Sequence, residues 1–306
     1  MAIRIYENPA PTSEPQPIAR RTRGVIFDLD GPDDMQSFYT AEAPEQFRRA
    51  MPASADHWHG NISAKESFRR GTFGDDKYTR KVDEFLDTID NNIHVEDEGD
   101  RRWHRRPVGY FPSVPDAIRN SPNSMWLKSD DFGDRSPLTI WVVTTMSGGC
   151  SNEDIAKRGA AITALLVKLQ QVRPVELKLV SLYGENQRWP NQFIIVPMPS
   201  RPIMVSQISW CLCDPGWTRH TYNLWNPTYH GDGSWHGIFQ HYRHSGNGEA
   251  DPQYHKDMLK FLEPVGATPN DVLVPQLYLL DKCVSDPIGW VKEHLDRYSR
   301  SYQEAA

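Results

Sequence analysis

The chain has 306 residues and a formal net charge of −6, with 34 lysines and arginines against 40 aspartates and glutamates. This length allows a substantial core, and the negative charge opposes unspecific binding to nucleic acid or anionic membranes. The longest apolar runs, such as residues 193–196, are far shorter than the roughly 20 residues of a membrane span, and no signal-peptide pattern begins the chain. We therefore expect a cytoplasmic protein with no membrane partner, whose four cysteines are buried, reduced thiols.

The N-terminal third is predicted to contain an arm and a mainly helical region. Residues 1–23 carry four prolines and few core-forming residues, which predicts an extended arm. Residues 24–106 follow as a mainly helical region that opens with a short strand at 24–28. Its clearest element is an amphipathic helix within 76–90, because apolar residues recur there at spacings of three and four. That apolar face consists of Tyr78, Val82, Phe85, Leu86 and Ile89.

Residues 107–306 are predicted to form a three-layer α/β domain. An apolar strand at 138–145 leads through a Gly-rich turn into a helix within 151–172, which Ser151 or Asn152 can cap, and a strand within 175–184 follows. Because such crossovers are right-handed, the two strands should lie parallel in one sheet with the helix on one face. Further elements are expected as a strand at 192–198, two helices broken at 214–216, a strand at 271–280 and a helix at 286–298.

The first candidate for chemistry is a pair of aspartates, Asp28 and Asp30, at the end of the strand at 24–28. The segment resembles the first motif of haloacid dehalogenase-type phosphatases, which implies a nucleophile at Asp28 and an acid-base group at Asp30 beside Mg²⁺. The sequence departs from that motif at Pro32, Asp33 and Asp34. No supporting sheet is expected directly downstream. We therefore favour a structural edge or accessory strand and keep the catalytic interpretation as an alternative.

The second candidate lies at the Gly-rich turn between the strand at 138–145 and the following helix. Ligands of open α/β sheets bind at the carboxyl ends of strands, and a Gly-rich turn before a helix can hold an anion. We expect the site to bind a ligand or partner through Thr145, Ser147, Gly148, Gly149 and Ser151.

The same turn resembles the metal-adhesion motif of von Willebrand factor A domains, Asp-x-Ser-x-Ser. Thr145 stands in the place of the Asp, Ser147 matches the first Ser, and Gly149 replaces the second. The resemblance implies a von Willebrand A-like, Rossmann-like sheet that contacts a protein partner. A hydroxyl is a poor ligand for a hard divalent cation, so we expect no metal there.

Short motifs on both sides of the turn resemble an uncharacterised protein family of tailed bacteriophages and prophages. They are Pro122 with Met125, the run 158–161, and the Trp-x-Gly and Gly-Asp pairs within 58–75. The resemblance implies a phage source, a phage or host protein as partner, and a location in the cytoplasm of the infected bacterium or in the virion. It implies no known activity.

Two further segments carry weaker candidates. His241 and His244 are three residues apart in a His-rich segment, a spacing that can hold Zn²⁺ if the segment is helical. We favour surface histidines there. A basic segment with an aromatic residue has the composition of a single-strand nucleic-acid contact, although the acidic residues just before it offer ion-pair partners. That segment contains Arg101, Arg102, Trp103, Arg105 and Arg106.

The sequence therefore predicts a non-catalytic binding or assembly protein without a cofactor, which uses a von Willebrand A-like domain for protein–protein interaction. One alternative is a metal-dependent hydrolase, phosphatase-like or nuclease-like, using Mg²⁺ or Zn²⁺. Another alternative is a nucleic-acid-binding replication or packaging factor.

Overall fold

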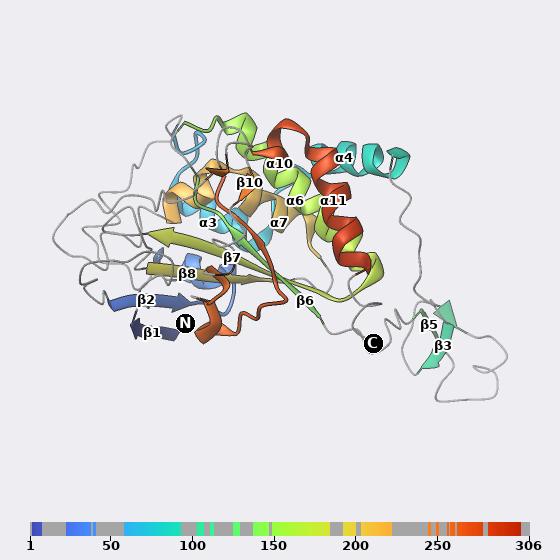
Figure 1. Cartoon of the computed structure of the whole chain (residues 1–306), viewed down its shortest axis with the longest axis horizontal. Coiled ribbons are helices and arrows are strands. Elements are labelled where there is room, and N and C mark those ends of the chain that lie inside the picture. Colours follow the sequence, from blue (N-terminus) through green and yellow to red (C-terminus); the bar gives the residue numbers. More distant parts are fainter. Residues whose placement is uncertain are drawn as a thin grey trace.

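A computed structural model of the chain shows a main sheet with a layer of helices on one of its sides (Figure 1). The described residues are 2–7, 23–37, 39–40, 58–92, 103–106, 111–112, 125–128, 137–146, 149–183, 192–199, 203–221, 244–245, 249–250, 256, 258–260, 262–277 and 281–300.

The main sheet is mixed and has six strands in the order β1-β2-β8-β7-β6-β11. These strands are β1 (Ala2–Glu7), β2 (Arg23–Asp28), β6 (Leu138–Val143), β7 (Val175–Tyr183), β8 (Gln192–Met198) and β11 (Val272–Val274). β6, β7 and β11 are parallel, whereas β8 is antiparallel to β7 and β2 is parallel to β8. The carboxyl end of β2 therefore lies at the opposite end of the sheet from the carboxyl ends of β6 and β11.

The predicted strand–helix–strand unit is confirmed. β6 leads into α6 (Asn152–Val172), and β7 then pairs with β6 in parallel, from Leu138 opposite Val175 onward. Ser151 begins α6 with a capping box, because its hydroxyl accepts from the Asp154 N–H while the Asp154 carboxylate accepts from the Ser151 N–H. The local sequence thus accounts for the position of this helix.

The helical layer consists mainly of helices from both halves of the chain. Figure 1 shows α3 (Ala64–Phe73), α4 (Thr79–Asn92), α6, α7 (Val205–Cys213), α10 (Lys282–Ser285) and α11 (Pro287–Arg300) together on one side of the sheet. A further helical stretch covers residues 215–221, and the short α1 (Pro32–Ser37) follows β2. A Cβ on Gly159 would lie 2.6 Å from the backbone carbonyl of Leu212, so α6 and α7 cross closely at this glycine.

The core lies between the helical layer and the sheet. Alternate strand residues such as Ile140, Leu177 and Ile194 pack there with Leu165 and Leu169 of α6, all at most 1% exposed. Each such aliphatic side chain stabilises the fold by roughly 1.5–3 kcal/mol relative to exposure. Val82 and Ile89 of α4 are also fully buried, which confirms the predicted amphipathic helix.

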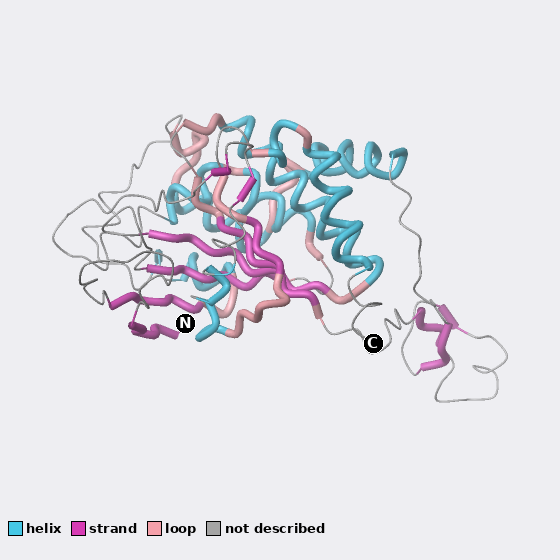
Figure 2. The backbone as a smooth tube through the Cα atoms, viewed as in Figure 1, coloured by secondary structure: helices cyan, strands magenta, loops and turns pink. Residues whose placement is uncertain are grey.

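The opposite face of the sheet carries a thinner layer from the segment before β11 (Figure 2). Trp141 is fully buried, and its indole N–H donates to Asp271 Oδ2 at 2.7 Å. Lys178 Nζ lies 4.4 Å from the Trp141 ring and donates to the carbonyl of Val265, which ends η2 (Glu263–Val265). Both faces of the sheet are therefore covered, and the predicted α/β class is confirmed.

The main sheet contains strands from all three of the regions that we expected to be separated at residues 23 and 106. Residues 2–7, expected in an extended arm, form β1 and pair antiparallel with β2. Ile3 and Ile5 alternate as in a strand, and the prolines that predicted an arm all lie after this segment. β2 itself lies between β1 and β8, so it is an interior strand rather than an edge strand. The N-terminal region therefore contributes to the same α/β sheet.

Two small sheets share no strand with the main one. The first has the order β3-β5-β4, from β3 (Trp103–Arg106), β5 (Met125–Lys128) and β4 (Phe111–Pro112). The second pairs β9 (His244–Ser245) with β10 (Glu249–Ala250). Among the described helices, none is long and apolar enough to cross a membrane.

Candidate functional site

The carboxyl ends of β6 and β11 meet α6 at a buried polar region, which we call the strand-end site. It consists of Thr144, Thr145, Arg158, Ser181 and Gln276. The two strands continue side by side past their ends, because Met146 bridges to Leu277 and the Leu277 N–H donates to the Thr145 carbonyl at 3.4 Å. Carboxyl ends of parallel strands are the usual ligand-binding position in α/β sheets.

Arg158 connects α6 to both strand ends. Its Nη2 donates to the carbonyl oxygens of Val143 at 2.9 Å and of Pro275 at 2.6 Å. The residue is only 3% exposed, and its Nε has no hydrogen-bond partner. No carboxylate of a described residue forms an ion pair with this guanidinium. Arg158 is therefore a buried cation held by two neutral carbonyls, with the Cys283 thiol also in contact with its side chain.

The hydroxyl and amide groups of the site divide into satisfied and unsatisfied ones. Thr144 Oγ1 lies 2.8 Å from Ser181 Oγ and 3.3 Å from the Val180 carbonyl, so this hydroxyl is satisfied. Thr145 and Gln276 are each 1% exposed, yet Thr145 Oγ1 and both polar atoms of the Gln276 amide have no partner. Leaving such groups unpaired costs about 1–3 kcal/mol each, so native structures rarely do it without a reason.

The other residues predicted for this site have different positions. Gly149 is exposed beside the start of α6, while Ser147 and Gly148 lie outside the described residues. Ser151 is exposed, and its hydroxyl is engaged in the capping box with Asp154. Of the predicted set, Thr145 therefore has the strongest signature of a ligand contact, and the structure adds Arg158 and Gln276.

The alternative aspartates lie at the other end of the sheet. Asp28 is the last residue of β2 and is half-buried, whereas Asp30 is exposed and its backbone N–H donates to Asp34 Oδ2 at 2.7 Å. Because β2 runs opposite to β6, these aspartates and Thr145 do not share a site. Within the described part of the chain, no three His, Cys, Asp or Glu side chains gather to hold a metal ion.

The two weaker candidates fall mainly on residues whose side chains the structure does not describe. Trp103, Arg105 and Arg106 lie in β3, while Arg101 and Arg102 are outside the described residues. His244 begins the strand β9, whereas the predicted metal site required a helical segment. His241 is also outside the described residues.

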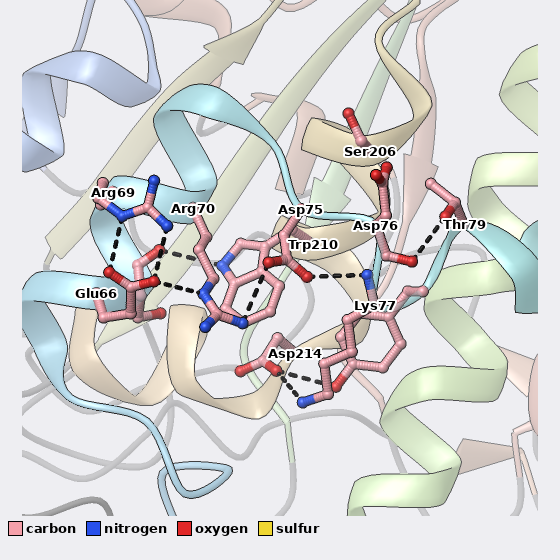
Figure 3. Close-up of polar contacts among 12 residues, drawn as sticks. Glu66, Arg69, Arg70, Asp75, Asp76, Lys77, Thr79, Ser206, Trp210 and Asp214 are labelled. Carbon is pink, nitrogen blue, oxygen red and sulfur yellow. Dashed lines mark hydrogen bonds and ion pairs between the residues drawn. The ribbon is translucent and has the colours of Figure 1, made fainter.

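A second polar region, which sequence reasoning missed, surrounds Asp214 between α7 and the helical residues 215–221 (Figure 3). The Asp214 side chain is fully buried and accepts from Lys77 Nζ and Tyr78 Oη, both at 2.9 Å, and from the Gly216 N–H at 2.8 Å. Burial, followed by the Asp214 charge, raises the pKa of Tyr78 far above its ordinary value, so the phenol stays a donor. We call Lys77, Tyr78 and Asp214 the Asp214 cluster.

Stacked cations and ion pairs surround the Asp214 cluster. Arg70 and Lys77 lie over the ring of the buried Trp210, at 5.0 Å and 5.5 Å from its centroid. Glu66 accepts from Arg69 and Arg70, and these hydrogen bonds lower the pKa of Glu66 to about 2. The cluster therefore joins the turn before α4 to α7, and the surrounding pairs add α3.

The cysteines are free and buried, as predicted. Burial raises the pKa of the Cys211, Cys213 and Cys283 thiols, in the last case to about 12. Because the thiolate is the nucleophilic form, these three residues are poorly suited to covalent catalysis.

Comparison with known proteins identifies a family for the chain. No curated protein and no solved structure matches the chain. A family model described as "Domain of unknown function (DUF7192)" matches residues 22–240. The match includes Thr145, Arg158 and the whole Asp214 cluster, while Gln276 lies beyond it. Because the matched residues make up well over half of the 306, the chain belongs to the DUF7192 family.

Proposed function

We propose that this protein is a non-catalytic binding protein and that a protein partner contacts its strand-end site. The observation that carries the proposal is the pair Thr145 and Gln276, whose side-chain polar atoms are buried without partners. A partner that supplies hydrogen-bonding groups at the strand ends would remove this cost on binding.

The chemistry of the site supports binding rather than hydrolysis. Its described side chains are hydroxyls, a primary amide and a guanidinium, none of which is a general base at neutral pH. Covalent catalysis requires a nucleophile within hydrogen-bond reach of a base. The nearby Cys283 thiol has a pKa raised to about 12 by burial.

The finer identity of the domain is also part of the proposal. The parallel pair β6 and β7, the crossover α6 and the turn after β6 support a von Willebrand A-like interpretation. Thr145 at the place of the motif's acid supports a contact that uses no metal. A phage or host protein as the partner rests on the short sequence motifs around this turn.

Two substitutions at neighbouring threonines test the proposal before any partner is known. Thr145→Val removes an unpaired buried hydroxyl at constant shape, so the free protein should gain about 1 kcal/mol and its Tm should rise by about 2 °C. Thr144→Val removes a hydroxyl that is bonded to Ser181 and Val180, so stability should fall by about 1 kcal/mol. Gln276→Leu should behave like Thr145→Val.

Affinity capture from the native host with the same variants as bait tests binding itself. The expected result is that the wild type and Thr144→Val recover the same proteins, because the Thr144 hydroxyl is already bonded to Ser181 and is not offered to a partner, whereas Thr145→Val and Gln276→Leu do not recover them. The proposal is overturned if Thr145→Val and Gln276→Leu destabilise the free protein, or if all four baits recover the same proteins.

A further inference from the structure

We infer that the strand-end site binds an oxyanion, a carboxylate or a phosphate group, and that Arg158 is the residue that holds it. This inference rests on the proposed function, because it names the chemistry of the group that enters the same site.

The first argument is the missing counter-charge of Arg158. A guanidinium is charged at every physiological pH, and burying a charge without a partner is costly. Two other buried charges in the protein are paired, Lys168 with Asp90 and Asp214 with Lys77. Arg158 contacts two backbone carbonyls and the Cys283 thiol, which are all neutral, and its Nε has no hydrogen-bond partner. An anion at this position would complete the pairing.

The second argument is the kind of groups that surround the guanidinium. Thr145 lies two residues after Val143 and Gln276 directly follows Pro275, the two residues whose carbonyls Arg158 contacts, and a hydroxyl and an amide can both donate hydrogen bonds. A planar guanidinium with further donors beside it matches the oxygens of a carboxylate or a phosphate. The site thus offers donors at three side chains.

The nearby acidic residues do not take the position of this anion. Glu153 pairs with Lys81 Nζ at 2.8 Å, and Asp154 closes the capping box of α6. Asp281 is buried at the start of α10, and both it and Arg158 influence the pKa of the Cys283 thiol, in opposite directions. None of the three forms an ion pair with Arg158 among the described residues.

The test is thermal denaturation of the full chain with inorganic phosphate or succinate at constant ionic strength, with chloride as the reference. We expect a saturable rise in Tm of about 3 °C or more once the anion is about tenfold above its Kd. Arg158→Met should abolish this rise. Arg158→Lys keeps the positive charge but loses the planar guanidinium, which can donate two parallel hydrogen bonds to an oxyanion. The affinity for the anion should therefore fall at least about tenfold.

The matched control is Arg173→Lys, at the other end of α6. Arg173 is also a buried arginine, and it donates to the Tyr298 carbonyl. This variant should lower Tm but keep the full response to the anion. If Arg158→Met does not fold, Arg158→Lys and Gln276→Leu are used instead, and both should show a weaker rise in Tm with the anion than the wild type. The inference is overturned if no oxyanion raises Tm beyond chloride, or if the Arg158 variants respond like the wild type.

Displacement separates the two sources of the oxyanion. If phosphate releases captured protein from the wild-type bait, the oxyanion belongs to an acidic side chain of the partner. If phosphate binds through Arg158 without releasing it, the ligand is a free small anion. A stabilising Thr145→Val with altered capture but no anion response would leave the proposed function intact and refute only this inference.

Discussion

The strand-end site and the Asp214 cluster are both buried polar regions beside the helical layer, but they differ in how their groups are satisfied. The Asp214 carboxylate receives three hydrogen bonds, from Lys77, Tyr78 and Gly216. Arg158 has no ion-pair partner among the described residues, and Thr145 and Gln276 leave polar atoms unpaired. A complete network stabilises the free protein, whereas an incomplete one is expected where a ligand completes it.

This difference predicts opposite signs for substitutions in the two regions. Removing a group from the Asp214 cluster leaves its partners unsatisfied and should destabilise the protein. Removing Thr145 Oγ1 or the Gln276 amide removes an unpaired group and should stabilise it. The sign of the change in stability therefore separates a structural polar network from a binding site.

The largest effect is expected at Asp214. Asp214→Ala leaves the buried Tyr78 hydroxyl and the Gly216 N–H without an acceptor, so the free energy of unfolding should fall by about 3 kcal/mol. Urea denaturation at pH 7 measures the loss. Lys77→Met is the control and should cost clearly less, because the Lys77 side chain is 45% exposed and its charge is partly solvated. Equal losses of unfolding free energy in the two variants would contradict the view that the Asp214 carboxylate is the central buried acceptor of this cluster.

Gly159 links the two regions, because it follows Arg158 on α6 and contacts α7 near Asp214. Gly159→Ala places a Cβ 2.6 Å from the Leu212 carbonyl, which forces the helices apart and should cost about 2 kcal/mol. Chemical denaturation checks this, with Lys157→Ala, a neighbour outside the buried face, expected to change stability by less than about 0.5 kcal/mol. A neutral Gly159→Ala would mean that α6 and α7 are not packed as described.

These regions also show what the sequence could predict. α4 and α6 have local apolar periodicity and, for α6, a capping box, so their positions followed from nearby residues. The pairing of β2 with β8 joins segments separated by more than half of the chain, and no local pattern encodes it. The expected boundary at residue 106 failed for this reason.

The candidate site also combines features that follow from nearby residues with features that depend on residues far apart in the sequence. The end of β6 at Thr145 was predictable, because ligands favour the carboxyl ends of strands. Gln276 offered one weak signal, a polar residue inside the apolar run 271–280. The Asp214 cluster offered none, because Lys77 and Tyr78 are 137 and 136 residues away from Asp214, and the Asp-Pro-Gly sequence indicates only a break between helices.

A smaller effect is expected from the Tyr78 hydroxyl alone. Tyr78→Phe should cost about 1.5 kcal/mol, because the hydroxyl donates to a buried carboxylate. In a double-mutant cycle with Asp214→Ala, the two changes should be non-additive by about 1 kcal/mol, since both remove the same bond. Additive losses would show that Tyr78 and Asp214 contribute independently, which would weaken the contrast with the strand-end site.

The smallest effect concerns the ion pairs around the Asp214 cluster and depends on pH. The pKa of Glu66 is lowered from an ordinary value of 4.5 to about 2, first by hydrogen bonds from Arg69 and Arg70. A lowered pKa in the folded state stabilises the protein above about pH 4.5, and this contribution disappears as the pH falls toward 2. Because the Glu66 side chain is 34% exposed, the contribution at pH 7 should be less than about 1 kcal/mol.

Glu66→Gln is the variant that isolates this contribution. The free energies of unfolding of the wild type and of Glu66→Gln should differ at pH 7 and converge as the pH falls from 4.5 toward 2, which urea denaturation at stepped pH values measures. The stabilising effect of Thr145→Val should be unchanged over this range, because neither its hydroxyl nor the introduced methyl group titrates. If the two variants shared one pH dependence, the surroundings of the Asp214 cluster and the strand-end site would be electrostatically coupled, and their separation into a structural and a binding region would fail.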